Sequence, residues 1–397
     1  MYNLEYVDDP LLLCTKYAAS INCNEKRKLE IQVIERAVII PNSGSSILSE
    51  NDFIKLNHPI SITDKPDYEK EPVIFIGNWY NVWGHLLTDT LSKLWILESN
   101  LYNETSLCNF DLVYCIDNNP FPKQFDELLD LIGMDKSKLR RIDKPTLFNK
   151  IYVPEDSIHV NSDKIVAETN ADKKEGLYLY CDEYKLIIDK LKCSVQSNTN
   201  SEKIYFSVGK TKKIFGSAVI ERILRKSGFQ IINPSSLSFK EQLSILKGCK
   251  VFCTIEGSIS FNALFLNSGS EVVLIRKLSY INSYQFMINQ ISNLKVTYID
   301  MHLSVLCDKK FPYLGPFFLY PNENFVKYLS SLGYNFKVDF SFIKFLNYII
   351  STFRSQSDRK YFLKEVCWDA NVYYFILLEK YFKENNLIRK ILRLFPR

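Results

Sequence analysis

The order of apolar and polar positions predicts strands that alternate with helices in the first half of the chain. Short apolar runs at residues 73–79 and 111–117 predict buried strands, and apolar residues at helical spacing over 83–97 predict a helix directly after the first of them. Further strands are expected over 29–40 and 150–155, and further helices over 125–134 and 177–192. Alternation of this kind predicts a parallel sheet.

The same alternation resumes after the polar stretch 194–202, which is the best linker in the sequence. Strands are expected over 203–208, 229–234, 250–255, 271–277 and 295–300, and helices over 217–228, 238–249 and 259–267. This is a doubly wound nucleotide-binding layout, in which ligands bind at the carboxyl ends of the strands.

A chain of 397 residues exceeds what one hydrophobic core usually supports, so two domains with a cleft between them are expected. We place the boundary near Thr199. The expected parts are therefore residues 1–199, residues 200–305, and an extension over 306–397 that holds an aromatic loop and apolar helical stretches.

Composition narrows the class of protein without fixing it. Hydrophobic residues make up 46% of the chain and charged residues 24%, which excludes disorder of the whole chain. The formal charge of +5 is small for this length and both signs are interspersed, so no nucleic-acid partner is demanded.

Ten cysteines are scattered from Cys14 to Cys367 without a CxxC pair or a cysteine and histidine cluster. The spacing suggests neither a zinc site nor a disulfide framework, and we interpret these residues as reduced, mostly buried thiols. The N-terminus lacks a signal-peptide pattern, and no stretch offers the ~20 apolar residues that span a bilayer. A cytoplasmic protein is expected.

The last residues, 383–397, form a basic amphipathic segment. Two interpretations stay open: a helix that packs on the protein body with its Lys and Arg side chains solvated, or a helix that attaches to a membrane surface.

The first group of residues with chemical potential lies where the strand over 73–79 gives way to the helix. His85 and Asp89 are four positions apart, so a helix brings them to one face, where a carboxylate holds an imidazole in one tautomer and raises its basicity. That pairing suits a general base acting on a hydroxyl. The alternative is that His85 caps or packs the helix start while Asp89 bonds nearby backbone.

The second group consists of Lys210, Lys212 and Lys213, directly after the strand over 203–208 and before a helix. Cationic side chains and backbone amides at a helix start suit an anion such as a nucleotide diphosphate. The sequence does not match the phosphate-binding loop GxxxxGK[ST]. The alternative is a lysine-rich surface turn.

The third group, Glu256, Gly257 and Ser258, lies in another turn from strand to helix. The Gly-Ser pair lets a ligand approach backbone amides at a helix start, and Glu256 suits a ribose or sugar hydroxyl. An ordinary capped turn is the alternative. A carboxylate at the end of a central strand favours the binding site.

The remaining polar residues offer less. His58, His159 and His302 stand alone and are expected to be structural or exposed, and no cysteine nucleophile or GxSxG motif is present. The acidic pair Asp8-Asp9 lies near the chain start and does not follow an apolar strand. We therefore expect no obligatory metal.

Taken together, these segments resemble glycosyltransferase family 61, especially bacterial members from capsule and lipopolysaccharide gene clusters. The stretch NVWGHLLTDTLSKLW resembles the family's aromatic-GHxxxDxL segment, with Gly84, His85 and Asp89 at matching places. A longer signature in the second half matches at Gly228, Phe229, Pro234, Ser238, Glu241, Gln242, Glu256, Gly257, Ser258, Asn262, Phe265 and Gly269. The resemblance covers residues from about 73 to about 300.

The resemblance implies an α/β, GT-B-like fold of two Rossmann-like doubly wound halves that face a cleft. The second half would hold the nucleotide-sugar donor, and the first would face a glycan or lipid-linked glycan acceptor. It also implies inversion at the anomeric carbon without a metal or other cofactor, in surface polysaccharide synthesis (capsule or O-antigen) at the cytoplasmic face of the inner membrane. His85 supported by Asp89 would be the base, and the donor residues would be Lys210, Lys212, Lys213, Gln242, Glu256, Gly257, Ser258 and Asn262.

Two departures from the family pattern affect the expected donor contacts. Ser207-Val208 stands where relatives often carry Ser-Arg, and Gly216-Ser217 stands where they carry Gly-Glu. The neighbouring lysines would then act as point charges without the bidentate geometry of arginine. Two other functions remain open: a nucleotide-sugar-modifying enzyme or dehydrogenase, although no GxGxxG follows a strand, and an inactive glycan-binding or scaffold subunit.

Overall fold

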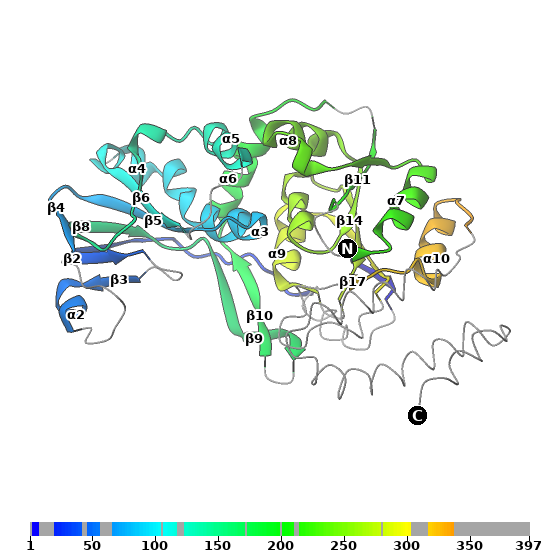
Figure 1. The fold of residues 1–397 in the computed structure, drawn as a ribbon, viewed down its shortest axis with the longest axis horizontal. Coiled ribbons are helices and arrows are strands. Elements are labelled where there is room, and N and C mark those ends of the chain that lie inside the picture. The colour runs from blue at the N-terminus through cyan, green and yellow to red at the C-terminus, as the bar shows by residue number, and fades with distance from the viewer. Residues whose placement is uncertain are drawn as a thin grey trace.

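The structure is a computed structural model, and it describes residues 2–7, 20–41, 46–55, 66–104, 106–116, 123–170, 173–198, 201–209, 214–278, 281–302 and 317–336. These residues form a mixed α/β protein with two lobes side by side, each built on one central sheet (Figure 1). The expected α/β class is therefore confirmed.

The sheet of the first lobe runs in the order β3-β2-β8-β5-β6-β7, with β4 beside β8. Its strands are β2 (Ile31–Ile40), β3 (Ser46–Ser49), β4 (Asp67–Glu69), β5 (Val73–Trp79), β6 (Asp111–Ile116), β7 (Leu139–Arg141) and β8 (Thr146–Pro154). Strand β2 is antiparallel to β3 and β8, while β5 is parallel to β6 and β8. The sheet is mixed, so the parallel sheet expected here forms only in part.

The helices of the first lobe include the one expected directly after β5. It runs as α3 (Trp83–His85), a π-helical turn η1 (Leu86–Thr90) and a 3-10 segment η2 (Leu91–Glu98). A wider turn in mid-helix is common at functional sites. The other helices are α2 (Glu50–Lys55), α4 (Asn100–Glu104), η3 (Ser106–Asn109), α5 (Lys123–Leu131) and η4 (Lys136–Lys138).

A two-stranded hairpin of β9 (Ile158–Asn170) and β10 (Lys173–Tyr180) extends from the region between the lobes (Figure 1). It corrects the helix expected over 177–192, because the helix α6 (Asp182–Cys193) begins only after the strand ends. Leu177 and Leu179 are buried and alternate with the half-buried Tyr178, which is the two-residue period of a strand. Acidic residues at 182 and 183 then favour a helix start.

The sheet of the second lobe is parallel throughout, in the order β1-β16-β15-β14-β11-β13. Its strands are β1 (Tyr2–Tyr6), β11 (Lys203–Phe206), β13 (Gln230–Ile232), β14 (Val251–Ile255), β15 (Glu271–Arg276) and β16 (Lys295–Asp300). The helices are α7 (Ser217–Lys226), η5 (Pro234–Ser236), α8 (Phe239–Gly248), η6 (Ser258–Phe265), α9 (Ser283–Ile291) and α10 (Glu323–Ser331), and a small pair joins β12 (Ile214–Phe215) to β17 (Phe317–Phe318). Every strand expected over 203–300 is present.

Two features tie the lobes together. Strand β1, near the start of the chain, lies at the edge of the second lobe's sheet, parallel to β16. One apolar cluster also includes buried residues from both lobes, among them Leu86 and Leu87 from the first and Phe261 and Phe265 from the second. One hydrophobic core is therefore continuous from one lobe to the other.

Several expectations fall on residues that the structure does not describe. These are the boundary at Thr199, most of the extension over 306–397, and its basic end over 383–397. Among the residues that are described, no helix is both long and apolar enough to cross a membrane.

Candidate active site

His85 and Asp89 lie on one face of the helical run that follows β5, as their spacing predicts. His85 Nδ1 is 2.7 Å from Asp89 Oδ2, and the His85 side chain is about half exposed. The hydrogen bond to Asp89 raises the pKa of the imidazole, while burial works in the opposite direction. When Nδ1 carries the proton that Asp89 accepts, the lone pair of the neutral ring is on Nε2.

The second oxygen of Asp89 is held from the other lobe. Tyr284, in α9, donates its hydroxyl to Asp89 Oδ1 at 3.0 Å, and Thr88 donates to the same oxygen at 3.0 Å. The Tyr284 ring stacks on Tyr178 of β10, with centroids 3.5 Å apart. Burial raises the pKa of Tyr284, so its hydroxyl stays protonated and acts as a donor.

The segment before His85 rests directly on the Glu256 turn. A Cβ added to the buried Gly84 would lie 3.2 Å from Ser258 Oγ and 3.3 Å from Phe261 Cε2. Trp83 donates its indole N–H to Asn262 Oδ1 at 3.3 Å. The first and third groups of residues therefore meet at the seam between the lobes, although they come from opposite halves of the chain.

The Glu256 turn continues into a row of buried charges at the carboxyl ends of three adjacent strands. Glu256 follows β14, Arg276 ends β15 and Asp300 ends β16, with Ile255 beside Ile275 and Arg276 beside Asp300 in the sheet register. Arg276 Nη1 is 3.4 Å from Asp300 Oδ2, and His302 Nε2 is 2.8 Å from Asp300 Oδ1. This edge of a parallel sheet is where ligands of such folds bind.

Glu256 is almost fully buried, and no side chain among the described residues donates a hydrogen bond to its carboxylate oxygens, although the backbone N–H of Asn282 interacts with the carboxylate. Burial raises the pKa of its carboxyl group to about 7, while the nearby Arg276 and Lys277 act to lower it. A buried polar group without a partner costs free energy, so these oxygens are suited to accept hydrogen bonds from a ligand hydroxyl.

Lys277 brings a cation to the same turn. The φ of Gly257 is 133°, a conformation that side chains rarely adopt, and a Cβ there would lie 2.9 Å from Lys277 Nζ. The Lys277 side chain is buried, with Nζ 4.7 Å from the centre of the Phe317 ring. A buried lysine beside a partly buried glycine turn suits an anionic group, although the Gly257 N–H already donates to Ser260 Oγ at 3.4 Å.

The other residues expected at the donor side divide into three cases. Asn262 is buried at the seam and also donates to Ile259 O at 2.8 Å. Gln242 is buried in α8, where its amide donates to Pro234 O at 2.9 Å, so it supports the loop after β13. Lys210, Lys212 and Lys213 lie outside the described residues.

Sequence reasoning missed Tyr284, Arg276 and Lys277. Tyr284 lies in a helix that the expected elements did not include, and nothing in its neighbourhood resembles a motif. Arg276 and Lys277 were visible as charges at the end of a predicted strand. The signal that identifies such residues is a charge where an apolar parallel strand ends.

A histidine held by a carboxylate is suited to general-base catalysis, and the carboxyl ends of parallel strands are where ligands of doubly wound folds bind. Residues 83–273 match the family described as Glycosyltransferase 61, and this stretch contains both the His85 segment and the Glu256 turn. That part of the chain belongs to glycosyltransferase family 61, and the protein is a glycosyltransferase. No curated protein matches the chain.

Proposed function

We propose that the protein is an inverting glycosyltransferase that moves a sugar from a nucleotide-sugar donor to a hydroxyl of a glycan or lipid-linked glycan. The observation that carries the proposal is the contact between the two lobes, because it brings His85, which we propose as the base, next to the turn at Ser258, which we propose binds the anion. The His85 pair and the turn at Ser258 are joined through Gly84.

The proposed reaction is a single displacement. The acceptor hydroxyl oxygen attacks the anomeric carbon while His85 Nε2 takes its proton, and the bond from that carbon to the diphosphate breaks. The nucleotide diphosphate leaves with the electron pair. Asp89 stabilises the imidazolium that forms, and Tyr284 keeps Asp89 in place.

The departing diphosphate needs positive charge and backbone donors. In this proposal Lys277 and the amides at Gly257 and Ser258 supply them, together with Lys210, Lys212 and Lys213. Glu256 accepts hydrogen bonds from a donor hydroxyl. With cations already at the turn, the transfer step is proposed to run without a divalent metal on the diphosphate.

The biological setting is proposed from the resemblance. Capsule or O-antigen synthesis supplies lipid-linked acceptors at the cytoplasmic face of the inner membrane, and the basic segment 383–397 suits a peripheral contact with anionic lipids. A GT-B-like division, with the acceptor on the first lobe and the donor on the second, belongs to the same proposal.

The test is incubation of the purified chain with a panel of UDP, GDP, CMP and dTDP sugars and glycan acceptors, measuring nucleotide release and the anomeric configuration of the product. We expect inverted product at a rate that added magnesium or manganese changes by less than about twofold. A retained configuration would refute the single displacement.

The same assay tests the base. His85→Ala should lower the transfer rate by roughly 100-fold or more, the usual contribution of a positioned base. Added imidazole should restore part of the rate, since the free base enters the space left by the side chain. A variant that transfers within a few fold of wild type would rule His85 out.

A further inference from the structure

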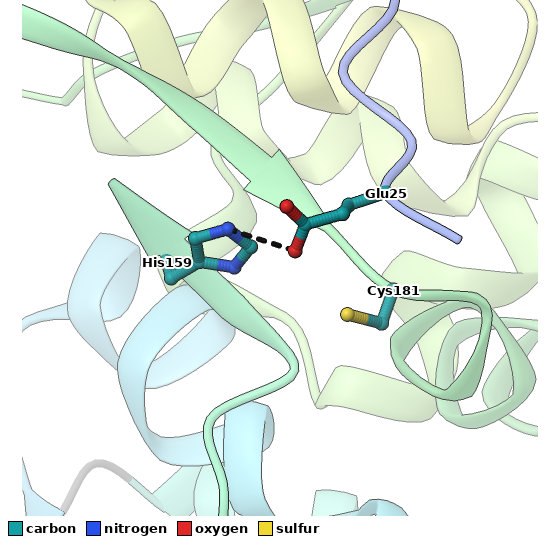
Figure 2. A group of neighbouring side chains, drawn as sticks. All are labelled: Glu25, His159 and Cys181. Atoms are coloured by element: carbon teal, nitrogen blue, oxygen red, sulfur yellow. Dashed lines mark ion pairs between the residues drawn. The ribbon is translucent and has the colours of Figure 1, made fainter. Parts of the chain in front are cut away.

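Three side chains from distant parts of the sequence converge at the base of the β9–β10 hairpin. Figure 2 shows Glu25, His159 and Cys181 pointing toward one another. Their ligand-type atoms all lie within 4.8 Å of one another, and His159 Nε2 is 3.0 Å from Glu25 Oε2. Carboxylate, imidazole and thiol groups are all metal ligands in proteins.

Backbone hydrogen bonds fix the three positions before any ligand binds. Glu25 donates its N–H to Tyr180 O at 2.8 Å, and Cys181 donates its N–H to Ser157 O at 2.8 Å. His159 faces Leu179 in the hairpin register. The three side chains are therefore held in a preorganised group, which lowers the cost of gathering them around an ion.

The atoms of this group are poorly satisfied without an ion. Glu25 Oε2 and His159 Nδ1 are buried and have no hydrogen-bond partner among the described residues, and Cys181 is buried without a disulfide. The contact between His159 and Glu25 has ion-pair distance but not hydrogen-bond geometry. Buried polar atoms in this condition point to a missing ligand.

We propose that Glu25, His159 and Cys181 bind a zinc ion. One sulfur, one nitrogen and one oxygen suit zinc, whereas magnesium and calcium prefer oxygen ligands alone. The ion fastens the segment before β2 to the base of the hairpin, and water fills its fourth position. This site is separate from the proposed transfer reaction, which does not use it.

Arg27 competes with zinc for two of the three ligands, because it pairs with the Glu25 carboxylate and forms a hydrogen bond with the Cys181 thiol. Its Nε lies 3.0 Å from Glu25 Oε2, while Nη1 donates to Glu155 Oε2 and Nη2 donates to Asp156 O, both at 3.2 Å. When zinc binds Glu25, Arg27 loses its contact with that carboxylate and keeps its hydrogen bonds to Glu155 and Asp156. Its positive charge opposes the approach of a second cation to the Glu25 carboxylate.

The experiment measures metal content of the full chain after equilibration with zinc and removal of the excess. We expect about one zinc per wild-type chain, and a loss of most of it in Cys181→Ser, His159→Ala and Glu25→Gln. The matched control is Cys193→Ser, which changes an exposed thiol at the end of α6 and should keep its zinc.

The absorption spectrum of the cobalt-substituted protein reports which side chains bind the metal. A thiolate-to-cobalt charge-transfer band in wild type and in Cys193→Ser, absent from Cys181→Ser, would support the site. Zinc should also raise the melting temperature of wild type and leave that of Glu25→Gln unchanged. Wild type that binds no stoichiometric zinc, or Cys181→Ser that binds as much, overturns the proposal.

Discussion

At the scale of single residues, the proposed chemistry depends on a chain of three side chains that crosses the seam. His85 bonds to one oxygen of Asp89, and Tyr284 bonds to the other. Each partner changes the charge that the imidazole experiences. Variants of the two partners should therefore move the pH profile in opposite directions.

Asp89→Asn removes the negative charge beside His85. The hydrogen bond to Asp89 raises the pKa of His85, and a base works only when neutral, so wild-type transfer falls as the pH drops through that raised pKa. The variant should have a lower His85 pKa. We expect its acid limb to move to lower pH, with a maximal rate reduced about 10-fold or more, in a pH series of kcat/KM. An unmoved acid limb would contradict the pairing.

Tyr284→Phe keeps the ring on Tyr178 and removes the hydroxyl that Asp89 accepts. A hydrogen bond to a charged group contributes about 1.5–3 kcal/mol, so kcat should fall by roughly 10- to 100-fold with little change in the donor KM. Asp89 then acts more strongly on His85, and the acid limb should move to higher pH.

Tyr68→Phe, at an exposed tyrosine of β4, is the control for that measurement. It should leave both kcat and the pH profile unchanged. If Tyr284→Phe raised only the donor KM, a role in positioning Asp89 would be excluded.

At this scale, the sequence predicted contacts within one helix but not contacts between distant segments. Spacing along one helix placed His85 and Asp89 on one face, because four residues make about one helical turn. The contact of Tyr284 with Asp89 depends on how two lobes pack, and no local pattern encodes it. The same holds for Glu25, His159 and Cys181, which sequence spacing did not bring together.

At the scale of elements, α3 and η6 approach closely because Gly84 has no side chain. Gly84→Ala would put a Cβ 3.2 Å from Ser258 Oγ and push the two helices apart. We expect a loss of about 1–3 kcal/mol in the free energy of unfolding, as in other overpacked sites, and a lower transfer rate. Denaturant unfolding and the transfer assay measure the two effects.

The double variant Gly84→Ala with Ser258→Gly provides the matching control. Removing the Ser258 side chain takes away the nearest atoms, although Phe261 Cε2 remains at 3.3 Å. Stability should return in part. If the double variant were less stable than the sum of the two single changes predicts, steric contact would not be the cause.

Elements with a strong apolar period were predictable, and those with two competing patterns were not. The strands of the second lobe are continuous apolar runs, which is typical of strands buried on both faces. Residues 177–180 combine a strand pattern with the start of an amphipathic helix, and the helical pattern obscured the strand. The antiparallel placement of β2 follows from its hairpin with β3, which alternation alone does not specify.

At the scale of the whole molecule, β1 joins the beginning of the chain to the second lobe. Tyr2 packs against Phe286, and Tyr6 packs against Tyr328, both edge to face. Deletion of residues 1–7 removes these contacts and exposes the edge of β16. We expect a loss of about 2–5 kcal/mol in the free energy of unfolding, comparable to removal of large buried side chains, measured by circular dichroism in denaturant.

If the deletion left the free energy of unfolding unchanged, β1 would not stabilise the sheet. The control is Tyr68→Phe again, because it alters an exposed tyrosine of the first lobe without touching either sheet edge of the second. The sequence predicted neither the pairing of β1 nor the apolar cluster that the lobes share, since both depend on contacts between distant segments.

The place of β1 has a consequence for synthesis on the ribosome. Its pairing partner, residues 295–300, is translated long after β1 itself has left the exit tunnel. Until then β1 has no strand to pair with, and Tyr2 and Tyr6 lack the aromatic side chains that they contact in the folded protein. Completion of the second lobe is therefore a late event of translation, and a chain that stalls before β16 leaves an unpaired strand open to chaperones or to aggregation.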